Sequence, residues 1–192
     1  MECSKCGIIK YKFEPFYLLS FQLSKIKKNK KKELGYNYYN DDININLYDA
    51  FFDAKREKID FCDNCQSKQK VSIQKDIYYL NKILIIHLDR GINNQQFKEK
   101  IEIPEKLDLS IFAIKKEKTR FYLYGIIALV NEKYCWNTIA LCRNDSKKNY
   151  FCCYNDDKIS QIDIKEIMEK QSNGKYEVGD IIPYILIYIE ES

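Results

Sequence analysis

The stretch FCDNC, residues 61–65, contains two cysteines spaced as in a metal-binding knuckle, and the same spacing occurs in CSKC, residues 3–6. A CxxC pair lets two sulfurs face one point across a tight turn, and Asp-Asn between the second pair suits such a turn. Two pairs can supply four thiolates to one tetrahedral zinc ion. The sequence therefore predicts a zinc site formed by Cys3, Cys6, Cys62 and Cys65. The alternative is four free thiols that happen to be spaced in pairs.

The distance between the two pairs indicates the role of this site. Residues 7–61 lie between the knuckles, so a shared zinc ion would clamp the base of a long insertion and not a short hairpin. Four protein ligands leave no open coordination position for a substrate. We therefore expect the zinc to be structural.

Composition and charge exclude several classes of function. A chain of 192 residues suits one domain with a substantial core, and its net charge of +4 is too balanced to indicate a nucleic-acid partner. No apolar run reaches the roughly 18 residues that a membrane span needs, and Met1–Lys10 is too polar for a signal peptide. Eight cysteines without a secretion signal indicate a reducing compartment. We expect an intracellular protein, cytoplasmic or nuclear, with neither nucleic acid nor membrane as a partner.

Most of the remaining sequence is typical of β-strands, because aromatic and β-branched residues dominate short segments separated by polar turns. Asn81–Asp89 is so apolar that it predicts a strand buried on both faces, and Pro104 interrupts the strand that contains it. The other predicted strands are Glu14–Leu23, the segment 70–80, Phe121–Val130, Cys135–Arg143, Asn149–Asn155 and Pro183–Glu190.

Two segments predict helices, and one charge run predicts neither helix nor strand. Leu47–Phe52 places Leu47, Ala50 and Phe51 on one helical face, and Ile159–Gln171 has apolar residues at helical spacing. The run Lys25–Lys32 is interpreted as a solvated hairpin tip or loop, because no interleaved aromatic residues support a nucleic-acid patch.

The order of these segments resembles the second half of the catalytic domain of the ubiquitin-specific protease (USP) family. In that family two CxxC pairs bind zinc in a region called the fingers, and the segments LNKILIIHLDR (Leu80–Arg90), KIEIPEKLDL and PYILIY each match a family strand or segment. The resemblance implies an α+β, mostly antiparallel half-domain of the papain-like cysteine protease superfamily. It assigns residues 1–75 to a zinc fingers region with an insertion and residues 76–192 to the C-terminal palm.

The resemblance also locates the positions of the catalytic residues in the palm. The family histidine lies in a GHYxAY segment, and the corresponding CWNTIALCR of this chain places Asn137 at the histidine. The third residue of the family triad corresponds to Asn155 in FCCYND, which Asp156 follows as in the family. The catalytic cysteine of the family lies in a box before the fingers, on a thumb region, and this sequence contains no such box.

These departures predict that the chain is catalytically inactive. Asparagine accepts no proton near neutral pH, so Asn137 cannot act as the base that activates a thiol. The sole histidine, His87, lies among apolar residues and is interpreted as a structural core residue, as the family histidine at that position also implies. Cys135, Cys152 and Cys153 are interpreted as packing residues of strands.

We therefore expect an inactive, USP-like domain that acts as a structural or interaction subunit. Its expected partners are ubiquitin, held by the fingers without cleavage, and proteins that cover the apolar surface left by the missing thumb. One alternative is the C-terminal piece of a split deubiquitinase whose cysteine box is supplied elsewhere, although Asn137 argues against it. A free ubiquitin-binding module and a truncated reading of a longer gene are further alternatives.

Overall fold

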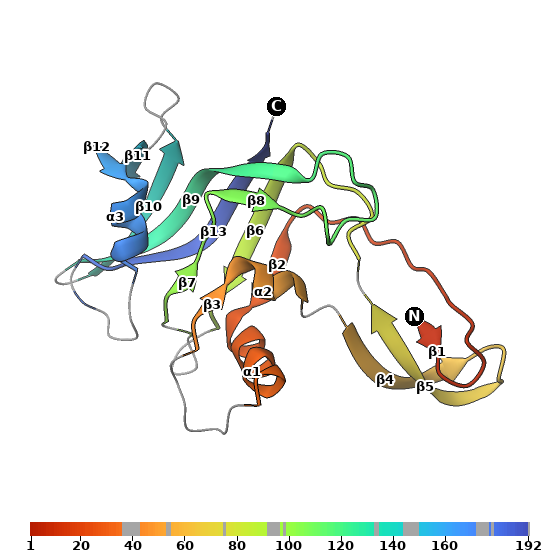
Figure 1. The fold of residues 1–192 in the computed structure, drawn as a ribbon. Coiled ribbons are helices and arrows are strands. Elements are labelled where there is room, and N and C mark those ends of the chain that lie inside the picture. The colour runs from red at the N-terminus through yellow and green to blue at the C-terminus, as the bar shows by residue number, and fades with distance from the viewer. Residues whose placement is uncertain are drawn as a thin grey trace.

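The computed structural model describes residues 1–35, 43–52, 55–74, 76–91, 97, 99–132, 135–143, 150–171, 177 and 179–191 of the chain (Figure 1). The helices are α1 (Leu23–Glu33), α2 (Leu47–Phe52) and α3 (Ile164–Glu169). The strands are β1 (Glu2–Cys3), β2 (Leu19–Gln22), β3 (Ile45–Asn46), β4 (Lys55–Cys62), β5 (Ser67–Gln74), β6 (Ile83–Asp89), β7 (Ile101–Glu102), β8 (Lys106–Asp108), β9 (Arg120–Glu132), β10 (Cys135–Arg143), β11 (Tyr150–Asn155), β12 (Lys158–Asp163) and β13 (Ile181–Glu190).

Most strands belong to one large sheet, which we call the palm sheet. Its strand order is β12-β11-β10-β9-β13-β6-β2, and β8 pairs with the beginning of β9. Neighbouring strands are antiparallel except β2 and β6, which run parallel. A short parallel pair, β3 with β7, lies outside this sheet. The mainly antiparallel strands and the short helices confirm the predicted α+β fold.

The long strands β9 and β13 form the centre of the palm sheet. Their ladder runs from Val130 opposite Ile181 to Phe121 opposite Glu190. β9 pairs on its other edge with β10, and β13 pairs on its other edge with β6. The sequence favours strands here because β-branched and aromatic residues fill both segments. The register of this ladder therefore determines where β10, which carries Asn137, lies.

The main core lies between the palm sheet and the helices. Its buried residues include Leu23 and Ile26 of α1, Leu47, Ala50 and Phe51 of α2, Ile167 of α3, and Leu84, Ile86, Leu88, Phe121, Leu123, Ile126, Leu141, Phe151, Leu186 and Tyr188 of the sheet. The predicted helix Leu47–Phe52 and its apolar face are both confirmed. No helix in the described part of the chain has the length and apolar character needed to cross a membrane.

The side chain of Arg90 ties the end of β6 to the neighbouring chain. It is only 3% exposed; its Nε donates to the carbonyl of Pro183 at 2.9 Å. Its Nη1 donates to the carbonyls of Phe97 and Glu99, both at 3.1 Å. Burying a guanidinium without such acceptors would be strongly unfavourable, so these bonds fix the chain beyond β6 against β13.

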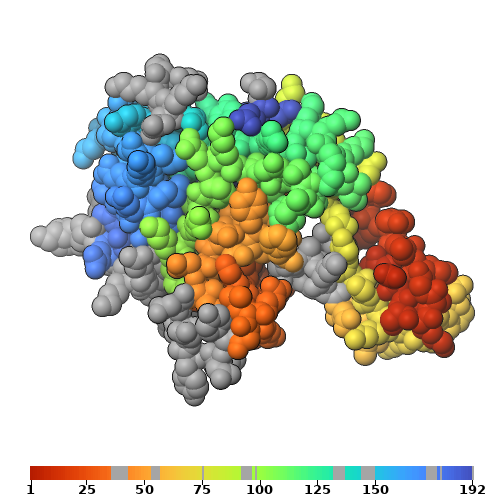
Figure 2. Space-filling model, viewed as in Figure 1, coloured from red at the N-terminus to blue at the C-terminus, as the bar shows by residue number. Residues whose placement is uncertain are grey.

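The strands β1, β5 and β4, in that order, form a separate sheet, which we call the fingers sheet. β4 and β5 are a hairpin whose register runs from Lys55 opposite Gln74 to Cys62 opposite Ser67, and β1 pairs with the other edge of β5. Figure 2 shows the fingers sheet as a lobe that projects from the palm, with open space between the lobe and α1 and α2. The division of the chain at residue 75 stays a prediction.

The charge run Lys25–Lys32 is helical, so the predicted hairpin tip or loop is wrong. It forms most of α1, which buries Ile26 and Lys27 on the side that faces the core. The buried Lys27 amine pairs with the carboxylate of Glu99 at 2.5 Å. The prediction failed because it counted charge alone, whereas unbranched lysine side chains favour helices and their stems can cover apolar surface.

The segment Ile159–Gln171, predicted as a helix, begins as a strand. β12 pairs with β11 along its whole length up to Asp163. The side chain of Asp163 then accepts a hydrogen bond from the backbone N–H of Lys165 at 2.7 Å and begins α3. This N-cap aspartate was the signal that separates the strand from the helix.

The strand predicted over Asn81–Asp89 is confirmed as β6, but its burial on both faces is wrong. Leu84, Ile86 and Leu88 are buried, and the residues between them are partly exposed. Such alternation is typical of an antiparallel sheet with one face toward the core. The strand predicted over Glu14–Leu23 is limited to the four residues of β2.

We predict that Tyr188→Phe lowers the free energy of unfolding by about 1–2 kcal/mol, because a partly buried carbonyl loses its donor. The Tyr188 hydroxyl is buried and donates to the carbonyl of Pro104 at 2.7 Å. Urea unfolding would measure the loss. The control is Tyr17→Phe at a side chain that is 91% exposed, where stability should not change. Equal stability of both variants would contradict the role of this hydrogen bond.

Candidate metal centre and palm site

The four predicted metal ligands come from two separate parts of the fingers sheet. Cys3 ends β1 and Cys62 ends β4, while Cys6 and Cys65 lie in the turns that follow these strands. A hydrogen bond from the Gly7 N–H to the Cys3 carbonyl at 2.8 Å closes the first turn. Gly7 has a φ of 69°, which glycine adopts without the strain of a side chain. The two turns therefore direct their cysteines toward each other.

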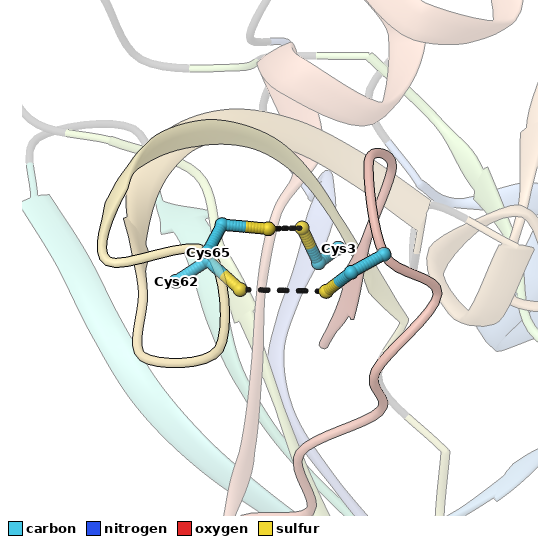
Figure 3. A group of neighbouring side chains, drawn as sticks. Cys3, Cys62 and Cys65 are labelled. Carbon is cyan, nitrogen blue, oxygen red and sulfur yellow. Dashed lines mark hydrogen bonds between the residues drawn. The ribbon is translucent and has the colours of Figure 1, made fainter.

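The structure brings the four sulfurs into one cluster, part of which Figure 3 shows. All four Sγ atoms lie within 4.8 Å of one another. The Sγ atoms of Cys3 and Cys65 are 4.0 Å apart, and those of Cys6 and Cys62 are 3.6 Å apart. Sulfurs at the corners of a tetrahedron, each about 2.3 Å from a central zinc ion, would lie about 3.8 Å apart. The cluster therefore fits a four-coordinate metal ion.

The thiols of this cluster differ in acidity. A hydrogen bond from the Ile8 backbone N–H lowers the pKa of Cys6 to about 6. Burial, with added effects of the neighbouring cysteines, raises the pKa of Cys65 to about 12. Four negative thiolates at this spacing would repel one another strongly unless a cation lay between them. A cluster of four thiolates therefore requires a bound cation, whereas without one some of the thiols keep their protons.

Two polar contacts that the sequence did not predict hold the knuckles together. Lys10 and Asp63 form an ion pair, which raises the pKa of the Lys10 amine. The hydroxyl of Ser4 donates to the carbonyl of Lys70 at 2.6 Å and joins the first knuckle to β5. Ser4 and Asp63 lie inside the two CxxC pairs, so their position was the available signal. From the sequence only a turn was predicted at Asp63, and nothing was assigned to Ser4.

Little besides the cysteines is buried in the fingers sheet. Among the residues of β1, β4 and β5 whose burial is described, only Cys3, Cys62 and Val71 are buried. Cys6 and Cys65 pack against these three. The sulfur cluster is thus most of the local core, and a metal ion bound there would stabilise the fingers sheet.

The predicted catalytic positions of the palm lie on neighbouring strands. Asn137 is near the beginning of β10, and Asn155 ends β11. Ala140 pairs with Tyr154, so the next step of this antiparallel ladder places Asn155 opposite Ile139. Asn137 lies two residues before Ile139 and therefore points to the same face of the sheet. Asp156 follows in a turn with a φ of 52°. The fold places Asn137 and Asn155 close together, and their assignment to a triad stays a prediction.

The histidine of this chain lies away from these positions. His87 is on β6, where its Nδ1 and the hydroxyl of Ser20 are 2.8 Å apart and share a hydrogen bond. In the palm sheet β13 and β9 lie between β6 and β10. Three strand spacings of about 4.8 Å therefore separate β6, which carries His87, from β10, which carries Asn137, by about 14 Å.

A palm sheet joined to a small sheet with four clustered cysteines is the arrangement that the sequence resemblance predicted for a domain of the deubiquitinase type. The family model of the ubiquitin carboxyl-terminal hydrolases matches residues 17–188, which is most of the chain. The chain therefore belongs to the ubiquitin carboxyl-terminal hydrolase family, and the USP resemblance is confirmed.

Individual relatives match only parts of longer proteins. Ubiquitin carboxyl-terminal hydrolase 4 of Pongo abelii and that of Bos taurus are each 33% identical over 76 residues, covering 37% of this chain and 8% of the relative. A solved SAGA DUB module, containing Ubp8, Sgf11, Sus1 and Sgf73 bound to monoubiquitin, matches with a TM-score of 0.70 and 19% identity. The match covers 100% of this chain and 39% of the solved chain and shows the shared fold. This chain spans well under half the length of these three proteins.

Proposed function

We propose that this chain is a catalytically inactive deubiquitinase-like domain that binds ubiquitin and acts as an interaction subunit. Its membership of the ubiquitin carboxyl-terminal hydrolase family supports ubiquitin as the partner. Its fold is similar to that of a module whose solved structure contains monoubiquitin and further protein subunits. The observation that carries the proposal of inactivity is Asn137 on β10.

The side chain of Asn137 cannot perform the step that the family histidine performs. Cysteine-type hydrolysis needs a base that removes the thiol proton, and an amide accepts no proton near neutral pH. The 192 residues include one histidine, and His87 on β6 lies too far from β10 to replace the missing base. Hydrolysis by the palm of this chain is therefore not expected.

Two partly exposed cysteines of the palm, Cys142 and Cys153, do not offer a substitute nucleophile. Burial raises the pKa of Cys142, and burial also raises the pKa of Cys153. Both thiols then stay protonated at neutral pH. A nucleophilic cysteine needs the opposite shift, because the thiolate is the reactive form.

The metal of the cysteine cluster is, in this proposal, one structural zinc ion. Zinc prefers tetrahedral thiolate sites, and Cys3, Cys6, Cys62 and Cys65 provide four sulfurs at suitable spacing. When bound, zinc would cross-link the two knuckles and supply folding free energy to the fingers sheet. All four coordination positions are then filled by protein, so the ion takes no part in catalysis.

We predict that Cys62→Ser abolishes the binding of one zinc ion per chain and unfolds the fingers sheet, because the sulfur cluster is most of its core. Zinc content would be measured by mass spectrometry of the metal, and the fingers by limited proteolysis at β4 and β5. Cys153→Ser, which alters a palm cysteine, should retain zinc and protease resistance. Full zinc content in Cys62→Ser would disprove the zinc assignment.

We predict that the chain releases no fluorophore from ubiquitin labelled at its C-terminus, because Asn137 cannot act as a base. A ubiquitin with a C-terminal electrophile should likewise form no covalent adduct. Turnover that is lost in Cys142→Ser or Cys152→Ser would disprove inactivity. An adduct formed only after addition of a second chain with a cysteine box would instead support a split deubiquitinase.

An exposed face of the fingers sheet is the proposed contact surface for ubiquitin. Along β4, Ile59 and Phe61 point to the face opposite to that of the buried Cys62. The two side chains are 76% and 52% exposed. Lys70 and Lys68 lie opposite them on β5. Apolar side chains on a rigid strand, bordered by charges, are typical of protein interfaces.

We predict that Ile59→Asp weakens ubiquitin binding at least about tenfold, since burial of a charge replaces an apolar contact. Calorimetric titration with monoubiquitin would measure the dissociation constant. The matched control is Ile159→Asp on β12, where the isoleucine is 69% exposed and lies in the palm sheet. Equal effects of the two variants would disprove the assigned face, and no binding by the unmodified chain would disprove ubiquitin as the partner.

A further inference from the structure

Cys142 on β10 and Cys152 on β11 lie directly opposite each other in the antiparallel ladder. The adjacent pair, Leu141 and Cys153, packs into the core. Successive side chains of a strand point to opposite faces, so Cys142 and Cys152 both point to the other face of the palm sheet. Both are free and partly exposed. The register therefore places two accessible thiols side by side.

The separation of this pair suits a disulfide. Directly opposed residues of antiparallel strands have Cα atoms about 4.5 or 5.5 Å apart and Cβ atoms about 4.5–5.5 Å apart. A disulfide joins Cα atoms about 4.4–6.8 Å apart and Cβ atoms about 3.5–4.5 Å apart. The two Cα ranges overlap and the two Cβ ranges meet at about 4.5 Å, so rotation of the side chains with a small approach of the two strands would form the bond without a change of register.

The strands on either side of the pair present Gly125 and Gln161 to it. On the far side of Cys142, β9 presents Gly125 directly opposite it, and the side chain of Ile187 from β13 lies 3.5 Å from where a Cβ of that glycine would be. On the far side of Cys152, β12 presents Gln161. Burial raises the pKa of Cys142, and Cys152 raises it further, so the thiolate of Cys142 forms only at alkaline pH.

We propose that Cys142 and Cys152 form a redox-active dithiol site, which peroxides oxidise to a cross-strand disulfide. The thiolate of one cysteine attacks an oxygen of hydrogen peroxide; the O–O bond breaks and yields a sulfenic acid and hydroxide, which takes up a proton as water. The sulfur of the other cysteine attacks the sulfenic sulfur; the S–O bond breaks, and hydroxide leaves with the thiol proton as water. Two thiols and one peroxide thus give one disulfide and two waters, with two electrons passing to the peroxide.

The disulfide would join the two strands that carry Asn137 and Asn155. In the unfolded chain the bond would close a loop from Cys142 to Cys152 and so lower the conformational entropy of the unfolded state. A cross-link of this loop size is expected to raise the Tm of a domain of this length by about 5 °C. The site is independent of hydrolysis, of zinc and of the ubiquitin surface.

The test uses the full chain with its metal, treated with hydrogen peroxide at about pH 8.5, near the ordinary pKa of a thiol. Digestion with trypsin without reductant places Cys142 in peptide 134–143 and Cys152 in peptide 149–158. Mass spectrometry should then find these two peptides joined. Because the peptides also contain Cys135 and Cys153, single variants are needed to assign the bond.

We predict that the joined peptides are lost in Cys142→Ser and in Cys152→Ser and are retained in Cys153→Ser, the adjacent thiol on the opposite face. The rise in Tm should follow the same pattern and should disappear after reduction. The proposal is overturned if the peptides stay joined in Cys142→Ser, if Cys153→Ser abolishes the link, or if peroxide yields only sulfinic and sulfonic acids.

Discussion

The palm depends on the pairing of β9 with β13, because each of these strands carries a further part of the sheet on its other edge. A slip of one residue in this ladder would turn the buried Leu123 and Leu186 out of the core, so burial determines the register. The same register fixes β10, with Asn137, on one side and β6, with His87, on the other. The distance between the amide and the imidazole is thus a consequence of how the core is packed.

The fingers follow a different physical rule from the palm. The palm buries a large apolar cluster, whereas the fingers sheet buries mainly its own cysteines. A small sheet with so little apolar burial needs a cross-link to be stable, and the proposed zinc ion would provide one. Two modes of stabilisation would then act in one chain.

Local patterns explain which parts were predictable. The CxxC pairs and the helix Leu47–Phe52 could be predicted because spacing alone determines them. The charged β4 was not predicted, since its strand conformation comes from pairing with β5. Lys25–Lys32 was assigned wrongly because its charge was counted alone, whereas the ion-pair partner of Lys27, Glu99, is distant in sequence. The opposition of Cys142 and Cys152 is likewise a property of strand register, which the sequence does not display.

The two groups of thiols lie at opposite ends of the molecule, with the fingers at one end and β10 and β11 at the other (Figure 1). Oxidation of thiolates that hold a metal ion would release the ion and loosen the fingers. Oxidation of the opposed pair in the palm would stiffen its strands. A single oxidant would therefore destabilise the fingers and stabilise the palm strands. A measurement of the stability of the whole molecule would average the two effects. Hydrogen exchange measured segment by segment would separate the end that opens from the end that closes.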